Sequence, residues 1–377
     1  MSSRNLVTGV TGFVGSHLAY RLLENGDHVL ALARGSRNES PRDRVLEVLR
    51  SVAGQHRDFN AHLNRLEVLE GDISQPRLGL SDDGYRHAAA SSDAVWHCAA
   101  SLSFEEEQRE EIFRLNVGGT LQVLDLVFQT PTRNLHHVST AYVAGMKDFS
   151  TESEINTGQT FRNPYEESKC KAETLVADAH AKGRIVARVY RPSIVIGDSD
   201  TGRATHFHGV YAFIRGLFTA ALRLRRKSAG SGPVHLPVRV LGKTTTTLNF
   251  VPIDYVVNGM VHIGHQQASA GGTFHLANPV PTPNDLWLPN ICRLLDVTGV
   301  ELVDQRAFDA LPQTKMEAVF QKQMAFYYMY LQGEPRFDCS RTLEALRGTG
   351  IECPRVTVEF IEKMVGWYVD YLRSGKP

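Results

Sequence analysis

The chain has little of several features that mark large classes of protein. Its 377 residues include five cysteines and no C-x-x-C spacing, so neither a disulfide framework nor a zinc site is indicated. The 41 basic and 41 acidic side chains cancel, so the charge balance does not point to nucleic acid or to an anionic membrane. No run of about 18 uncharged apolar residues is present. These absences predict a globular protein with no metal site, no nucleic-acid partner and no transmembrane segment.

The N-terminus enters a predicted strand directly. Its first residues, MSSRNLVTGVTG, do not show the charged, apolar and small-residue regions of a secretory signal peptide. Hydrophobic residues make up 42% of the chain, enough for one large domain or two lobes with a substantial core. Because the sequence shows neither a signal-peptide pattern nor a disulfide framework, we expect a cytoplasmic protein in a reducing compartment.

A glycine-rich turn follows the first predicted strand, residues 5–8. The stretch TGVTGFVGSHLAYRLLENG carries glycines at 9, 12 and 15 and continues as an amphipathic helix. Strand, glycine turn and helix form the context of a dinucleotide-binding fingerprint, although the spacing here is G-x-x-G-x-x-G. The glycines let the backbone approach a pyrophosphate at the helix N-terminus. The residues that we expect to bind the cofactor here are Gly9, Thr11, Gly12, Phe13, Val14 and Gly15.

The second predicted strand, HVLALAR, ends at Arg34. An acidic residue at this place would bind the ribose 2′-hydroxyl, whereas an arginine suits a 2′-phosphate. Arg37 and Arg44 add positive charge close by in the sequence. The pattern favours NADPH over NADH, and the alternative is a set of solvated loop arginines.

Four further predicted strands alternate with helical stretches along the N-terminal half. They are RLEVLEGDIS, SDAVWHCAA, NLHHVSTAYVAG and RIVARVYRPSIVIG. This alternation predicts an α/β fold with a doubly wound parallel sheet, which binds ligands at the carboxyl ends of its strands. Positions at these ends that we expect to contact the cofactor are Asp72, with its carboxylate toward the adenine amine, Ile73, Ala99 and Ala100.

The segment NPYEESKCKAE places Tyr165 and Lys169 four residues apart, behind Pro164. Proline suits the first position of a helix, and residues i and i+4 share one helix face. A nearby cation lowers the pKa of a phenol, and a phenol tuned towards neutrality serves as a general acid or base. Because this spacing also occurs on solvated helices, the pair by itself is only a candidate.

Together these motifs resemble the extended short-chain dehydrogenase/reductases over essentially the whole chain. The matching segments are TGVTGFVG, GDIS, LNVGGT, VSTAYVAG and YEESK. FRNPYEESKCKAE followed by YRPSIVIGDS resembles the fatty acyl reductase and thioester reductase branch, which includes terminal reductase domains of carboxylic acid reductases and peptide synthetases. The resemblance implies an NADPH-dependent reductase of an acyl thioester or a related aldehyde or ketone. Its substrate would be carried on coenzyme A or on a phosphopantetheine carrier protein.

The resemblance also assigns roles to single residues. Tyr165 matches the catalytic tyrosine, and Lys169 matches the lysine that also binds the nicotinamide ribose. Thr140 matches the catalytic hydroxyl, and Asn116 matches an asparagine that steadies this end of the site. The positions that match residues lining the cofactor are Ser139, Pro192, Ser193 and Ile194.

The pattern changes in the C-terminal half. ATHFHGVYAFIRGLFTAALRLRRK predicts a helix with a basic end, which is either a core helix or the wall of an acyl channel with a basic mouth. The aromatic cluster in KMEAVFQKQMAFYYMYLQGEP suits either a core or an apolar substrate tunnel. We expect a Rossmann domain of residues 1–200 with 236–262 returning to it. Residues 201–235 and 263–377 then form a smaller, mostly helical substrate lobe.

Three other functions stay open at this point. A nucleotide-sugar epimerase or dehydratase would share the fold and the tyrosine–lysine pair. A sterol-type hydroxy dehydrogenase would run the same chemistry in the oxidative direction. A redox-sensing regulator would bind the dinucleotide without turnover, although such regulators usually lack the tyrosine or the lysine. The acyl chain, its carrier, the product and the oligomeric state are not encoded in any motif that we identify.

Overall fold

The computed structural model describes residues 2–36, 38–54, 58–226 and 232–375, without the side chains of residues 322–327. Arg37, which we expected to add positive charge near the end of the second predicted strand, lies outside these ranges. The chain divides into two compact units. The first unit comprises Met1–Ser193, Ile253–Ala277 and Pro335–Glu352. The second unit comprises Ile194–Pro252, Asn278–Glu334 and Cys353–Pro377.

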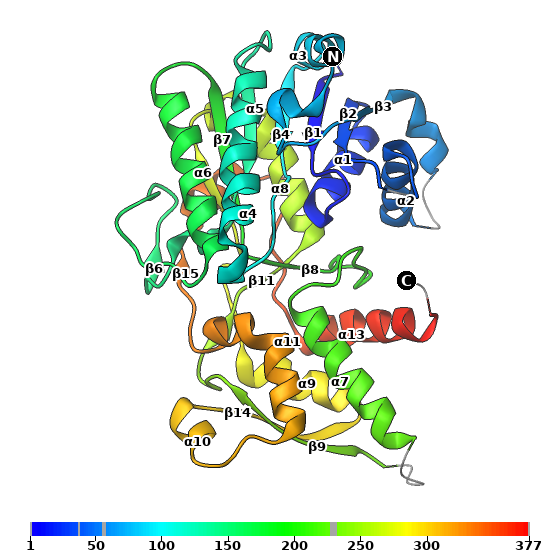
Figure 1. Ribbon diagram of the computed structural model, residues 1–377, viewed down its shortest axis with the longest axis vertical. Helices are drawn as coiled ribbons and strands as arrows, with labels where there is room; N and C mark the ends of the chain where they lie inside the picture. Colours follow the sequence, from blue (N-terminus) through cyan, green and yellow to red (C-terminus); the bar gives the residue numbers. More distant parts are fainter. Residues whose placement is uncertain (1, 37, 55–57, 227–231, 376–377) are drawn as a thin grey trace. The chain divides into compact units, whose positions relative to one another are not determined.

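The first unit is built on a seven-stranded parallel sheet (Figure 1). The strands run in the spatial order β12-β7-β5-β4-β1-β2-β3, and every neighbouring pair is parallel. The strand order reverses between β1 and β4, which is where a doubly wound sheet binds its ligand. The predicted doubly wound α/β fold is therefore confirmed. The strands are β1 (Arg4–Thr8), β2 (His28–Ala33), β3 (Leu66–Glu70), β4 (Ala94–His97), β5 (Asn134–Val138), β7 (Val186–Pro192) and β12 (Thr273–Leu276).

Helices cover both faces of this sheet. On one face α1 packs against α2 and α8, and on the other α5 packs against α3 and α6. The helices of the first unit are α1 (Phe13–Glu24), α2 (Pro41–Ala53), α3 (Asp82–Ala90), α4 (Arg109–Phe113), α5 (Gly119–Val127), α6 (Pro164–Ala181), α8 (Ile253–His265) and α12 (Ser340–Ala345). Short 3₁₀ segments are η1 (Phe59–Arg65), η2 (Pro76–Gly79), η3 (Glu106–Gln108), η5 (Ala141–Ala144) and η6 (Gln267–Ser269), and η4 (Arg114–Gly118) is π-helical. The short strands β6 (Phe149–Ser150) and β15 (Arg336–Phe337) pair with each other.

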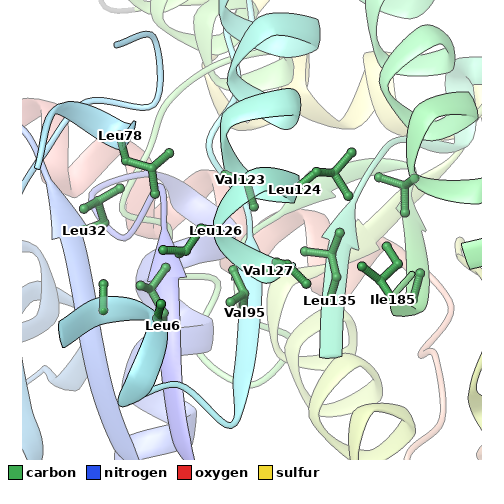
Figure 2. Packing of buried hydrophobic residues seen from close by; sticks show 14 of the residues in the cluster. Leu6, Leu32, Leu78, Val95, Val123, Leu124, Leu126, Val127, Leu135 and Ile185 are labelled. Atoms are coloured by element: carbon green, nitrogen blue, oxygen red, sulfur yellow. The ribbon is translucent and has the colours of Figure 1, made fainter. Parts of the chain in front are cut away.

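Leucine and valine side chains fill the space between the sheet and α5 (Figure 2). Leu6, Val95 and Leu135 project from β1, β4 and β5 and are completely buried. Opposite them α5 presents Val123, Leu126 and Val127, which are also completely buried. The spacing of these helix positions, three and four residues apart, is the apolar stripe that an amphipathic helix turns towards a core. This packing fixes the position of each strand relative to its neighbours and therefore fixes where the carboxyl ends of the strands lie.

A row of rings lies on the opposite face of the sheet. Trp96 stacks on His136 with their ring centroids 3.7 Å apart, and the His136 Nδ1 lies 2.9 Å from the Tyr190 hydroxyl. Phe274 of β12 continues the row beyond Tyr190. Helix α8 lies directly on these rings because residue 264 is a glycine, whose added Cβ would come within 2.7 Å of Trp96.

The second unit is mostly helical, as predicted. Its strands form three small pairs: β8 (Ile194–Ile196) with β11 (Phe250–Pro252), β9 (Val234–Leu241) with β14 (Val297–Val303), and β10 (Thr247–Leu248) with β13 (Thr282–Pro283). Its helices are α7 (Val210–Arg225), α9 (Asn284–Leu294), α10 (Gln305–Asp309), α11 (Lys315–Leu331) and α13 (Val358–Arg373). In the described parts of the chain, no helix has the combination of length and apolar character needed to cross a membrane.

Two segments have sequences that suit either a core helix or the wall of an acyl channel or substrate tunnel. They are residues 204–227 and 315–334, and both lie in the second unit. The Phe320 ring of α11 packs edge-on against Phe213 of α7, with centroids 5.4 Å apart, so this part of the aromatic cluster lies in a core. At the basic end of α7, the Arg225 guanidinium pairs with Asp296 at 2.6 Å. The side chains of Met324, Phe326 and Tyr327 and the residue Lys227 lie outside the described residues.

The boundaries of the two units differ from the domain boundaries that we expected. The first segment of the first unit ends at Ser193 rather than at 200, and of the segment 236–262 only the part from Ile253 onwards belongs to this unit. Residues 263–277 and 335–352, which we expected in the substrate lobe, also belong to the first unit. The reason is that RIVARVYRPSIVIG forms two strands, of which β7 joins the large sheet and β8 pairs with β11. The four-residue β12 then completes the sheet beside β7. Whether the units divide cofactor and substrate binding as expected stays a prediction.

Replacing Leu126 by alanine should lower the free energy of unfolding by about 2–5 kcal/mol, because it leaves a cavity in the core between α5 and the sheet. Leu121→Ala is the matched control, since Leu121 lies on the same helix but is 43% exposed, and it should cost about 0.5 kcal/mol. Urea denaturation followed by circular dichroism measures both values. Equal losses in the two variants would contradict the assigned position of the core.

Candidate active site

The glycine turn between β1 and α1 has the shape that the sequence predicts. Gly9 adopts a φ of +72°, and the Gly12 amide donates to the Gly9 carbonyl at 2.9 Å. Helix α1 then begins at Phe13, and Gly12 at its N-cap brings no side chain to occupy the first amides of the helix. The turn also lies against the end of β4, because a Cβ on Gly9 would come within 2.5 Å of the Ala99 nitrogen. Backbone amides with this exposure and dipole direction suit a pyrophosphate.

Positive charge gathers at the carboxyl ends of β2 and β3. The Arg34 Nη1 lies 3.7 Å from Asp72 Oδ2, and Arg44 Nη1 donates to the Arg34 carbonyl at 2.6 Å. Burial raises the pKa of Asp72, but hydrogen bonds from Ser74 and the charges of Arg34 and Arg114 outweigh it, so that the pKa is lowered overall. Arg114 is a member of this group that the sequence analysis missed, because it lies far away in the sequence, just before the LNVGGT motif.

Helix α6 starts where the sequence predicts. Its first residue is Pro164, and the Asn163 side chain caps the helix by accepting from the Glu166 amide at 3.0 Å. Lys169 is 3% exposed, and its Nζ donates to the Val138 carbonyl at the end of β5 at 2.6 Å. Burial lowers the pKa of Lys169 to about 8, against an opposing effect of nearby acidic groups.

The environment of Tyr165 differs from the expectation. Burial of the hydroxyl raises the pKa of Tyr165 to about 12, although a hydrogen bond with Thr140 acts in the opposite direction and the charge of Glu166 adds to the rise. The expected lowering of this pKa by Lys169 is therefore wrong, because burial dominates and the lysine ammonium is directed at the Val138 carbonyl. A phenol with this pKa is protonated at neutral pH, which is the form that a proton donor needs.

The ends of β5 and β7 are joined beside the tyrosine. Thr140 Oγ1 donates to the Pro192 carbonyl at 3.4 Å, and the Ser139 amide donates to the Tyr190 carbonyl at 2.7 Å. Ser193 follows in the same unit and is 8% exposed. Ile194 is the first residue of the second unit, and its expected contact with the cofactor stays a prediction.

Asn116 connects the segment after β4 to helix α6. It lies in the π-helical turn η4, a type of turn that is frequent at functional sites. Its Nδ2 donates to Ser168 Oγ at 2.9 Å, and its Oδ1 accepts from the Ser101 amide at 2.7 Å. The side chain thus braces the helix turn that carries Tyr165, in keeping with the steadying role implied by the resemblance.

Two contacts to the same helix turn had no signal in the sequence. The Phe104 ring lies edge-on to Tyr165 with centroids 5.2 Å apart, and Arg109 Nη1 donates to Glu167 Oε2 at 2.7 Å. Both side chains come from the polar stretch SLSFEEEQR, which has neither strand nor helix periodicity. Only the course of the chain after β4 brings them to α6.

The residues of the first unit fit a nicotinamide dinucleotide. The glycine turn and the α1 N-terminus suit its pyrophosphate, and the arginines suit a phosphorylated ribose. Thr140 follows the end of β5, and Tyr165 and Lys169 lie at the start of α6. The site residues predicted from sequence that belong to the first unit therefore gather along the carboxyl edge of one sheet.

Comparisons with known proteins agree with this geometry. Residues 7–260 match the NAD-binding family described as male sterility protein. A linear gramicidin synthase of Brevibacillus parabrevis is 26% identical over 98% of the chain, which spans 7% of that protein. Glycine betaine reductase of Emericella nidulans is 26% identical over 73% of the chain, spanning 21% of that protein.

The chain thus covers about a fifth or less of these two relatives. Among solved structures, the terminal R domain of the myxalamid PKS-NRPS pathway is 25% identical with a TM-score of 0.80. That alignment covers 100% of this chain and 93% of the R domain. The chain accordingly belongs to the male sterility family of NAD-binding proteins, and it is an NAD(P)-dependent oxidoreductase of the extended short-chain dehydrogenase/reductase type.

Proposed function

We propose that the chain is an NADPH-dependent reductase that acts on the carbonyl group of an acyl thioester, or of a related aldehyde or ketone. The observation that carries this proposal is the placement of a phenol, a partner hydroxyl and a buried ammonium at the carboxyl edge of the same parallel sheet that carries the glycine turn. These groups are Tyr165, Thr140 and Lys169. Each supplies one part of carbonyl reduction.

The chemistry of the chain's own residues follows from their protonation states. When it is bound, NADPH supplies the hydride to the carbonyl carbon. Thr140 donates a hydrogen bond to the substrate oxygen, and Tyr165 transfers its proton to that oxygen as negative charge develops there. Lys169 presents an ammonium that orients the nicotinamide ribose. With a thioester, the product of hydride and proton addition is a hemithioacetal, which collapses to an aldehyde and a free thiol.

The substrate class is supported by the relatives. The chain resembles a terminal reductase domain over its full length and is related to part of a linear gramicidin synthase. The thioester reductase branch that the sequence resembles implies a substrate carried as a thioester, so we propose a phosphopantetheine carrier protein or coenzyme A as the partner. The described cysteines form no disulfide, as expected for the cytoplasmic location that we propose.

The test is NADPH consumption, followed by absorbance, with an acyl-coenzyme A, with an acyl-pantetheine thioester and with the matching aldehyde. Turnover of either thioester with release of thiol supports the proposal, whereas turnover of the aldehyde alone restricts the enzyme to simple carbonyl compounds.

Tyr165→Phe should reduce turnover at least about 100-fold and leave NADPH affinity within about threefold, because it removes the transferable proton and little else. Full activity in this variant would refute the assignment of the proton donor. Oxidation of a hydroxysteroid or conversion of a nucleotide sugar instead would establish one of the alternative functions.

Replacing Arg34 by alanine should weaken NADPH binding about tenfold or more, because a charged hydrogen bond to the 2′-phosphate is lost. NADH, which lacks this phosphate, should bind with unchanged affinity. Arg21→Ala is the control, since Arg21 is another partly exposed arginine of the first unit, paired with Glu24 on α1. Fluorescence titration with both cofactors measures the ratio, and an equal loss for NADH and NADPH would refute a role in selecting the phosphate.

Replacing Gly15 by alanine should abolish cofactor binding, because the new Cβ would lie 2.1 Å from the Gly9 carbonyl oxygen and force the turn open. Gly366→Ala is the control, since a Cβ there meets nothing within 4 Å and Gly366 lies inside α13. The control should bind cofactor normally and be slightly more stable, as alanine favours helix. Isothermal titration with NADPH checks both variants, and normal binding by the Gly15 variant would contradict the proposed cradle.

A further inference from the structure

We infer that Glu173 is a positioning residue of the active site: its buried carboxylate is the counter-charge that holds Lys169 in its ammonium form, and Arg191 fixes that carboxylate in place. The inference rests on the proposed function, because it concerns the lysine that is to orient the nicotinamide ribose. Glu173 stands outside the tyrosine–lysine motif, and the sequence analysis assigned it no role.

Glu173 and Lys169 contact consecutive residues at the end of β5. Lys169 Nζ donates to the Val138 carbonyl at 2.6 Å, and Ser139 Oγ donates to Glu173 Oε2 at 2.8 Å. The two charged residues are four positions apart on α6, so they lie on the same helix face as Tyr165. The helix therefore carries a phenol, an ammonium and a carboxylate in one line, one turn apart.

Arg191 holds the Glu173 carboxylate through both oxygen atoms. Its Nε donates to Oε1 at 2.9 Å and to Oε2 at 3.2 Å, and its Nη2 donates to Oε1 at 2.5 Å. Both side chains are completely buried. The same guanidinium donates to the Thr151 carbonyl at 3.3 Å and to the Glu154 carbonyl at 2.5 Å, so it also ties down the loop that leads to α6. The carboxylate is therefore held in one orientation, on the face of α6 that it shares with Lys169.

The other titratable groups around Lys169 are uncharged at neutral pH. From β4 and the residue after it, burial lowers the pKa of His97 to about 3 and raises that of Cys98 to about 12. From β5, burial places the pKa of His137 well below its usual value. Tyr165, on α6 itself, keeps its proton as well. Among the described groups facing Lys169, this leaves Glu173 to supply the negative charge.

The groups around Glu173 and Arg191 complete the charge balance. Burial, together with the Glu173 charge, raises the pKa of Cys170 to about 11, so this thiol is neutral. Burial and the Arg191 charge lower the pKa of His275 to about 3, and its Nε2 lies 3.2 Å from Arg191 Nη1. The completely buried part of the cluster thus holds one anion, Glu173, beside the cations Lys169 and Arg191, whereas the Glu154 carboxylate that also faces Arg191 is 38% exposed and pairs with Lys147. Removing the buried anion disfavours both cations, and because an arginine does not lose its proton in proteins, the lysine is the group that becomes neutral.

The direction of the pH effect follows from this balance. Burial holds the pKa of Lys169 at about 8 while Glu173 opposes the lowering, so the wild-type lysine is mostly protonated at pH 7. Removing the carboxylate lowers that pKa further, and the ammonium is lost near neutral pH. Lowering the pH restores the ammonium form of Lys169 in the variant. A purely structural role of Glu173 would weaken the site at every pH alike.

The experiment measures NADPH affinity by fluorescence titration from pH 6 to pH 9, without substrate, for the wild type and Glu173→Gln. The glutamine keeps the shape and can still accept from Ser139. We expect the variant to bind about threefold more weakly than wild type at pH 7.5 and about ninefold more weakly at pH 9, and to match wild type at pH 6, because a downward shift of about one unit from a pKa of about 8 requires these ratios. Glu317→Gln is the matched control, because Glu317 forms a comparably buried pair with Arg239 at 2.7 Å in the second unit, and it should follow the wild-type pH profile.

A second variant keeps the inference testable if Glu173→Gln does not fold. Glu173→Asp keeps the carboxylate on a shorter side chain, so the ammonium of Lys169 should persist and the variant should bind NADPH within about twofold of wild type from pH 6 to pH 9. A larger loss that is independent of pH in either variant, or a pH profile of the glutamine variant identical to wild type, overturns the inference. Failure of the wild-type protein to bind any nicotinamide cofactor would instead refute the proposed function.

Discussion

The hydrogen bond from the Lys169 ammonium to the Val138 carbonyl is the contact on which the arrangement of the site depends. It joins helix α6 to the end of β5 and so fixes the distance between the helix that carries Tyr165 and the strand that leads to Thr140. An ammonium that is 3% exposed has lost most of its water. Burying it without a counter-charge is unfavourable, so the chain surrounds it with a carbonyl oxygen and a carboxylate on the same helix.

The parallel sheet turns this local contact into a complete site. In a parallel sheet all strands end at one edge, so the glycine turn after β1, the arginine after β2 and the hydroxyl after β5 meet there although more than a hundred residues separate them. Close packing sets the strand positions: Leu6, Val95 and Leu135 on one face and the row of rings under Gly264 on the other. A shift of one strand would move its terminal side chain out of the site.

Burial, more than pairing of charges, decides the protonation states in this site. It raises the pKa of Tyr165 and lowers that of Lys169, which are opposite shifts with the same cause, because low polarity disfavours the charged form of each group. Sequence spacing showed that the two side chains share a helix face, and from this we expected the ammonium to lower the tyrosine pKa. That expectation failed because the spacing carries no information about what surrounds the pair, and here the ammonium is directed at a backbone carbonyl.

Local patterns in the sequence determined the parts of the protein that depend on neighbouring residues. The glycine turn, the start of α6 at Pro164 and the parallel, doubly wound character of the sheet follow from spacing and alternation, and the structure reproduces them. The grouping of Arg114 with Arg34, the contact of Phe104 with Tyr165 and the pairing of Glu173 with Arg191 were decided only by the tertiary structure. So was the division of RIVARVYRPSIVIG between two sheets. These features join residues distant in the chain, and their energies come from burial and long-range pairing, which no short stretch of sequence encodes.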